Sequence, residues 1–207
     1  MCAIVDTDAA AAAGWAPVDL ARALLDGGAR FLQVRAKRLP SGPLLDLCDA
    51  VVRAAAPSGA MVIVNDRADL ARLSGAAGVH LGQDDLPPPA ARALLGDAAV
   101  VGWSTHTAAQ IERAAVEPIT YVAVGPVFGT ATKDTGYDPV GLTLVREAAR
   151  RTALPVVAIG GITLERAAEV WRAGAASVAV ISDLLAGGNP AARVASYNRV
   201  ASAVRND

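Results

Sequence analysis

Basic and amide side chains gather at the end of one short strand-like run of the sequence. The predicted strand Phe31–Arg35 ends within the segment Gln-Val-Arg-Ala-Lys at positions 33–37, and strand alternation puts Gln33, Arg35 and Lys37 on one side. Burying such side chains costs free energy unless they bind an anion. The alternative is that the two basic groups reach solvent. We therefore predict an anion-binding site where this strand ends.

Carboxylates follow the next two apolar runs. Val62–Asn65 leads into Asp66, and Val79–Leu81 leads into Gly-Gln-Asp-Asp at 82–85. If these runs are adjacent strands, Asp66 lies close to Asp84 or Asp85. Paired carboxylates beside cationic groups are an ordinary way to hold Mg²⁺ against phosphates. The alternative is a helix cap for Asp66 and a simple turn for the other two.

A second anion site is indicated near the C-terminal end of the chain. Gly160 and Gly161 follow the run Val156–Ile159, and Ser182 follows Ser177–Ile181. Glycines let backbone N–H groups approach a phosphate, and a short helical turn at 183–185 would favour its charge. This combination is typical of the phosphate site of α/β barrels.

The remaining polar positions are less specific. The segment Gly125–Gly141 holds hydroxyls, a lysine and glycines, so it is either an anion-binding loop or a solvated one. We expect Ser104 to bond a ligand and Thr107 to cap the next helix. We interpret His106 as structural, and we expect His80 to face the helix layer.

Alternating strand and helix patterns must position these side chains. Strand-like runs alternate with helical segments about eight times, which predicts a closed (β/α)8 TIM barrel as a single compact domain over residues 1–207. A doubly wound sheet is the alternative, but the glycine fingerprint is missing after Ala3–Val5. The predicted helices are Val18–Asp26, Leu44–Ala55, Ala68–Leu73, Pro88–Leu95, Ala108–Val116, Leu142–Arg151, Leu164–Ala173 and Ala191–Val204; the other predicted strands are Val100–Ser104 and Tyr121–Val124.

Composition narrows the function classes. The 207 residues are 53% hydrophobic and 4% aromatic with a formal net charge of −1, which argues against a nucleic-acid partner. The two cysteines form no metal spacing or redox pair. The sequence shows no leader-like segment and no membrane span, so we expect a cytoplasmic enzyme without a membrane partner. We expect its substrates to be small phosphorylated molecules. Whether it forms a homo-oligomer is left open.

The motifs together resemble the thiamine-phosphate synthase family, in family order from about residue 28 to residue 182. The matching segments are Gln33–Lys37, Asn65-Asp66-Arg67, residues 78–85, Thr130–Lys133, residues 159–162 and Ile181-Ser182. The sequence departs from the family pattern in two places. The first strand is abbreviated, which could leave the barrel edge beside it incompletely paired, and Gly129 stands where the family commonly has proline.

The resemblance implies a Mg²⁺-dependent transferase of pyrimidinylmethyl groups. The family joins hydroxymethylpyrimidine diphosphate to a thiazole phosphate, with or without a carboxylate, and releases pyrophosphate by dissociative displacement. By resemblance, the pyrimidine diphosphate is bound by Gln33, Val34, Arg35, Ala36, Lys37, Asn65, Ser104 and Lys133. The thiazole phosphate is bound by Thr130, Ala131, Thr132, Gly161, Ile181 and Ser182. Asp66 and Asp85 hold Mg²⁺, and the catalytic groups are Arg35, Lys37, Ser104 and Lys133.

Other functions stay open on the sequence. A thiazole tautomerase of the same superfamily would use His106 as acid–base and would not need the carboxylate pair. A regulatory or ligand-binding paralogue would keep the monophosphate site but lose the diphosphate site. An unrelated phosphate-binding barrel would need an acid–base pair inside the barrel, and the sequence predicts none.

Overall fold

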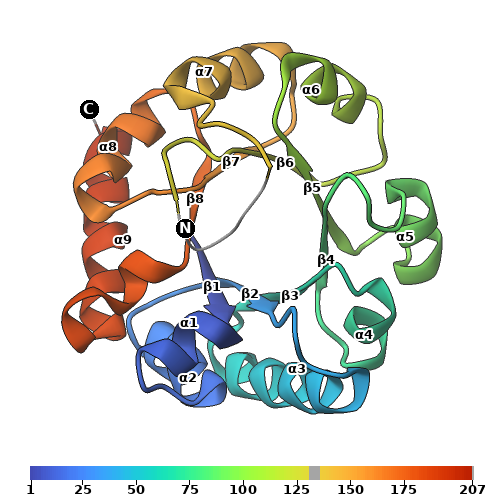
Figure 1. The fold of residues 1–207 in the computed structure, drawn as a ribbon, viewed down its shortest axis with the longest axis vertical. Helices are drawn as coiled ribbons and strands as arrows, with labels where there is room; N and C mark the ends of the chain where they lie inside the picture. The colour runs from blue at the N-terminus through green and yellow to red at the C-terminus, as the bar shows by residue number, and fades with distance from the viewer. Residues whose placement is uncertain (131–135, 207) are drawn as a thin grey trace.

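The computed structural model describes residues 1–130 and 136–206. Within these residues, eight parallel strands form a closed barrel in sequence order, so the predicted (β/α)8 fold is confirmed (Figure 1). The strands are β1 (Cys2–Asp6), β2 (Phe31–Arg35), β3 (Met61–Asn65), β4 (Gly78–Leu81), β5 (Val100–Thr105), β6 (Tyr121–Val124), β7 (Val156–Ile159) and β8 (Ser177–Val180).

Helices surround this barrel on its outer side (Figure 1). They are α1 (Thr7–Ala12), α2 (Pro17–Asp26), α3 (Ser41–Ala55), α4 (Ala68–Leu73), α5 (Pro88–Leu95), α6 (Ala108–Ala114), α7 (Gly141–Arg151), α8 (Leu164–Arg172) and α9 (Pro190–Asn206), with short 3₁₀ helices η1 (Ala56–Ser58) and η2 (Ser182–Gly188). The helix α1 is formed by the alanine run, and the Asp6 carboxylate caps it by accepting from the Ala9 N–H at 2.9 Å.

The apolar core has two parts, which follow from strand alternation. One cluster fills the barrel interior, and a larger one joins the strands to the helices. Both faces of each strand are therefore buried, as expected for a parallel barrel. The interior cluster consists of Cys2, Ile4, Ile63, Tyr121, Ala123, Val157 and Ala179.

The first strand closes the barrel and is not abbreviated, because it spans five residues, Cys2–Asp6, where the sequence pattern predicted Ala3–Val5. It pairs with β2 from Ala3↔Leu32 to Asp6↔Arg35, and with β8 through Cys2↔Ala179 and Ala3↔Val180. The barrel therefore has no open edge between β8 and β2.

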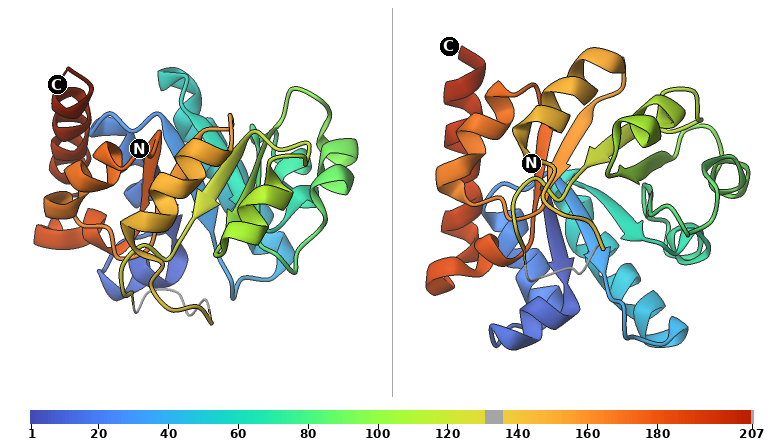
Figure 2. Two further views of the ribbon diagram at one scale, coloured as in Figure 1. Left: turned by 90° about the horizontal axis from the view of Figure 1, so that it is seen from above. Right: turned by 45° about the horizontal axis from the view of Figure 1, so that its top comes forward.

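The segment after β6, drawn in yellow, lies over one end of the barrel in Figure 2. Its described parts are fastened to β7 by backbone hydrogen bonds from Val127 N–H to the Ile159 carbonyl (2.8 Å) and from Phe128 N–H to the Gly160 carbonyl (3.0 Å). The carboxyl ends of the strands also open at one end of the barrel, where active sites of this fold lie.

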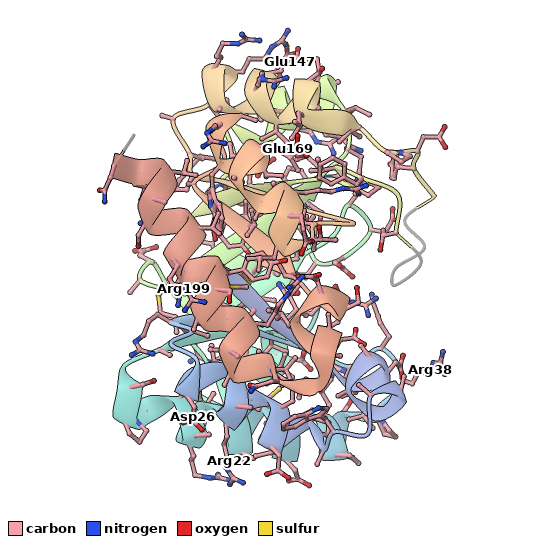
Figure 3. All side chains as sticks on the ribbon, turned by 90° about the vertical axis from the view of Figure 1, so that its left-hand side faces the viewer. Arg22, Asp26, Arg38, Glu147, Glu169 and Arg199 are labelled. Atoms are coloured by element: carbon pink, nitrogen blue, oxygen red, sulfur yellow. The ribbon has the colours of Figure 1, made fainter. Side chains whose placement is uncertain are left out.

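The outer helix faces are charged. Figure 3 labels examples on α2, the loop after β2, α7, α8 and α9: Arg22, Asp26, Arg38, Glu147, Glu169 and Arg199. Among the described residues, no helix combines the length and apolar character that crossing a membrane requires.

Candidate active site

Arg35 is held inside the barrel mouth by an acidic partner that the sequence did not predict. Its guanidinium bonds the Asp6 carboxylate across the register pair Asp6↔Arg35, and both residues are buried. The Arg35 Nε has no hydrogen-bond partner in the described part of the chain. A buried N–H of this kind is costly unless a ligand accepts from it.

Lys37, Asp66 and Asp85 meet beside Arg35 at the ends of β2, β3 and β4. The Lys37 ammonium lies 2.5 Å from Asp66 Oδ2, and Asp85 Oδ2 accepts from the Gly82 N–H at 2.6 Å. Burial raises the pKa of the Asp66 carboxyl; hydrogen bonding to Lys37 lowers it, and hydrogen bonding to Asp85 raises it further. The sequence pattern paired Asp66 with Asp84 or Asp85, and the structure brings it together with Asp85, with a cation beside them.

The backbone at Asp66 is unusual. Among the described non-glycine residues, Asp66 alone has a positive φ, at 65°. Its N–H donates to the His80 carbonyl at 2.7 Å, and this bond ties the end of β3 to β4. Strained backbone of this kind concentrates at functional sites because the surrounding structure must hold it. The simple helix-cap interpretation of Asp66 is not what the structure shows, because Arg67 occupies the cap position of α4.

His80 does not face the helix layer, so that expectation is wrong. Its imidazole lies inside the barrel, where Nε2 is 2.9 Å from Ser104 Oγ and Nδ1 is 2.8 Å from the Tyr121 hydroxyl. The neighbouring Val79 and Leu81 pack on the helices instead. Strand alternation explains this orientation. Because the two aliphatic side chains pack on the apolar helix layer, the polar side chain between them points into the barrel.

The loops after β7 and β8 converge as the sequence predicted. Gly160 and Gly161 have φ values of 103° and 60°, and Ser182 begins the short helix η2. The Gly161 N–H makes no hydrogen bond with any described residue. A backbone donor beside a helical turn is suited to a phosphate.

Asp183 fixes the position of η2. Its carboxylate accepts from the Leu164 N–H at 3.1 Å, from Arg193 at 2.7 Å and from the Tyr197 hydroxyl at 2.5 Å. Burial and this carboxylate together raise the pKa of the Tyr197 phenol, which therefore stays a donor. The network joins η2 to α8 and α9 directly behind Ser182.

His106 contacts the segment after β6 and also lines the cavity. Its Nδ1–H donates to the Gly125 carbonyl at 2.5 Å, and its ring stacks on Tyr137 with centroids 4.0 Å apart. Thr107 caps α6 as expected, by accepting from the Gln110 N–H. The histidine thus helps to fasten the start of the segment after β6.

One cavity opens among these loops. Its lining includes residues that the sequence analysis singled out, namely His80, Ser104, His106, Thr130, Gly160, Gly161, Ile181 and Ser182. A second set of polar side chains, the charged group, comes from β2, β3, β4 and the loops that follow them. It consists of Arg35, Lys37, Asp66 and Asp85 with the amides of Gln33 and Asn65. The site therefore has two polar parts around one mouth.

Some predicted residues have side chains outside these two parts, and others are not described by the structure. Val34 and Ala36 pack against the helix layer, so only their backbone belongs to the mouth. Ala131, Thr132 and Lys133 lie outside the described residues. Sequence reasoning missed Asp6 and Tyr121, and it assigned His80 to the wrong face of its strand. Of the two missed residues only Asp6 carried a signal, since it follows the first strand as Asp66 follows the third.

Comparison with known proteins identifies the family. Residues 1–184 match the family model described as thiamine monophosphate synthase. The chain belongs to this family. Thiamine-phosphate synthases similar to it include one from Anaeromyxobacter dehalogenans, 48% identical over 86% of this chain and 80% of the relative. Another, from Roseiflexus castenholzii, is 42% identical over 96% of this chain and 87% of the relative.

A solved structure supports the same assignment. The thiamine phosphate pyrophosphorylase from Pyrococcus furiosus superposes with a TM-score of 0.88 at 26% identity, covering 98% of this chain and 96% of that one. The thiamine monophosphate synthase family thus accounts for the fold over nearly the whole chain, and its named enzymes are transferases.

Proposed function

We propose that this chain is a thiamine-phosphate synthase that joins hydroxymethylpyrimidine diphosphate to a thiazole phosphate and releases pyrophosphate. The observation that carries the proposal is the presence of two separate polar parts at the carboxyl ends of the strands. One is the charged group at β2–β4, with the ion pairs Arg35–Asp6 and Lys37–Asp66. The other is the glycine and serine loop pair after β7 and β8, which lines the cavity. Two differently phosphorylated substrates need such an arrangement.

The charged group suits a diphosphate with Mg²⁺. Asp66 and Asp85 would hold the metal, because two carboxyls in contact repel each other unless a cation lies between them. When bound, Mg²⁺ would neutralise diphosphate oxygens and so favour their departure as a leaving group. Arg35 and Lys37 would bind the same oxygens, and the unpartnered Arg35 Nε is one available donor.

The loop pair suits the monophosphate of the thiazole. The Gly161 N–H and the start of η2 at Ser182 would donate to its oxygens, since backbone donors at a helix start favour negative charge. Thr130 and Ile181 line the same cavity. The thiazole nitrogen would then face the pyrimidine methylene.

The chemistry needs no side-chain nucleophile. The bond between the pyrimidine methylene and the diphosphate oxygen breaks, and its electron pair leaves with pyrophosphate. The electron-rich aminopyrimidine stabilises the resulting cation, and the thiazole nitrogen donates its lone pair to form the new carbon–nitrogen bond. The protein contributes position and electrostatic stabilisation, with Lys133 proposed to act on the departing diphosphate.

The test is a product assay with purified protein. Both substrates and Mg²⁺ are supplied, and thiamine phosphate is identified by mass. Omitting the pyrimidine diphosphate and following the thiazole alone separates the tautomerase from the synthase. Tight thiazole phosphate binding without any turnover would instead support a ligand-binding paralogue.

A further inference from the structure

Three polar side chains form a chain of hydrogen bonds across the inside of the barrel. His80 on β4, Gly102 on β5 and Tyr121 on β6 are register partners, so they lie in one layer. Ser104 lies two residues beyond Gly102 toward the mouth. The imidazole of His80 bridges Tyr121 and Ser104, with distances of 2.8 and 2.9 Å.

Gly102 makes this bridge possible. A Cβ at this position would lie 2.1 Å from Tyr121 Cζ and 2.3 Å from its hydroxyl oxygen. The tyrosine ring therefore crosses β5 through the space that glycine leaves, and it stacks on His80 with centroids 5.7 Å apart and planes 16° apart. All three polar residues are buried.

The buried tyrosine decides which nitrogen of His80 carries the proton. Burial raises the pKa of the Tyr121 phenol well above its usual value, so the phenol keeps its proton. Within residues 1–130 and 136–206, this hydroxyl has one hydrogen-bond partner, His80 Nδ1. An unsatisfied buried O–H is costly, so Nδ1 accepts from Tyr121 and the ring proton stays on Nε2.

The direction of this chain determines what Ser104 offers to a ligand. Because Nε2–H donates to Ser104 Oγ, that oxygen is already an acceptor, and its own proton is left to point elsewhere. Among the described residues the hydroxyl makes no second hydrogen bond, and Ser104 lines the cavity. The serine is thus presented to the cavity as a donor.

We propose that His80, held in one tautomer by Tyr121, is a positioning residue that fixes the Ser104 hydroxyl as a hydrogen-bond donor to the pyrimidine diphosphate substrate. This proposal rests on the proposed function for the identity of the ligand. The tautomer of His80 and the direction of the hydrogen bonds are independent of the proposed function. A fixed donor contributes more than a freely rotating hydroxyl, because the cost of orienting it is met during folding.

The tautomer is tested on the free protein by ¹⁵N NMR of the imidazole rings. The chain has two histidines, so a His106→Gln variant assigns the signals. At neutral pH we expect His80 as the Nε2–H tautomer in the wild type and a mixture of tautomers in Tyr121→Phe. An Nδ1–H tautomer in the wild type, or no change in Tyr121→Phe, would overturn the proposal.

The effect on Ser104 is tested by a double-mutant cycle with steady-state kinetics. His80→Leu should lower kcat/KM for the pyrimidine diphosphate about five- to tenfold, the effect of one neutral hydrogen bond, and leave the KM for the thiazole phosphate unchanged. In a Ser104→Ala background the same change should cost almost nothing, because His80 acts through the serine. His80→Gln retains an amide donor and should recover part of the loss.

Additive effects of His80→Leu and Ser104→Ala would overturn the positioning role. A melting curve of each variant identifies loss of fold. If His80→Leu does not fold, Tyr121→Phe replaces it in the cycle. Tyr121→Phe should lower kcat/KM for the pyrimidine diphosphate by a smaller factor, and this loss should also vanish in the Ser104→Ala background. Absence of thiamine phosphate from the wild-type reaction would reject the proposed function while leaving the NMR result valid.

Discussion

Gly161 has two reasons to be glycine, and they can be measured separately. Its φ of 60° lies in the left-handed region, and a Cβ there would lie 2.4 Å from the Gly129 carbonyl oxygen and 2.9 Å from Phe128 Cβ. Gly161→Ala therefore introduces backbone strain of about 1–2 kcal/mol. Overpacking against the loop after β6 adds about 1–3 kcal/mol. We expect the free energy of unfolding to fall by about 2–5 kcal/mol.

The same change should weaken one substrate selectively. Displacing the Gly161 N–H removes a hydrogen bond to a charged group, which contributes about 1.5–3 kcal/mol. We therefore expect the KM for the thiazole phosphate to rise about ten- to hundredfold, while the KM for the pyrimidine diphosphate stays nearly constant. Steady-state kinetics with each substrate varied in turn, beside urea unfolding, makes the measurement.

Two other glycines provide matched controls. Gly187 has a φ of 74° but open space around its Cβ position, so Gly187→Ala carries the strain alone. Gly129 has open space and no positive φ, so Gly129→Ala should be close to neutral. If Gly161→Ala resembles Gly187→Ala in stability and raises both KM values equally, the reasoning about a separate monophosphate site is refuted.

Three further predictions follow from the charged part of the site. Asp66→Asn and Asp85→Asn should each keep the fold by circular dichroism but abolish Mg²⁺-dependent turnover; near-normal activity of both at low Mg²⁺ would contradict the metal assignment. Lys133→Ala should lower kcat about 10²–10³-fold with a nearly unchanged melting temperature, and an unchanged kcat would remove this lysine from the mechanism. Asp6→Ala leaves Arg35 buried without its carboxylate and should cost about 3–5 kcal/mol in urea unfolding; a loss below about 1 kcal/mol would show that the pair does not support the mouth.

The fold could be predicted because its local signals agree. Short β-branched runs and amphipathic segments alternate along the chain, and helices such as α4 and α5 begin and end where the sequence pattern placed them. The positions that follow each strand could also be predicted, since carboxyl ends of parallel strands open at one end of a barrel. This geometry brought Asp66 together with Asp84 or Asp85 without any knowledge of side-chain contacts, and Asp85 is the partner in the structure.

The contacts inside the barrel could not be predicted in the same way. A four-residue strand such as β4 gives too short a pattern to show which face is inside, so His80 was placed wrongly. The bond between Asp6 and Arg35 depends on the register of β1 against β2, which no local pattern specifies. Tyr121 reaches His80 only because Gly102 lies between them, and that relation joins three strands distant in sequence.

The central claim is that two phosphorylated substrates bind at this mouth, where a carbon–nitrogen bond forms between them and pyrophosphate is released. Its most direct test is the stoichiometry of the reaction of the purified protein with both substrates, with Mg²⁺ or with excess chelator. We predict one pyrophosphate released for each thiamine phosphate formed when Mg²⁺ is present, and neither product after chelation. Thiamine phosphate formed at the same rate without divalent metal, or no thiamine phosphate under any condition, would contradict the account.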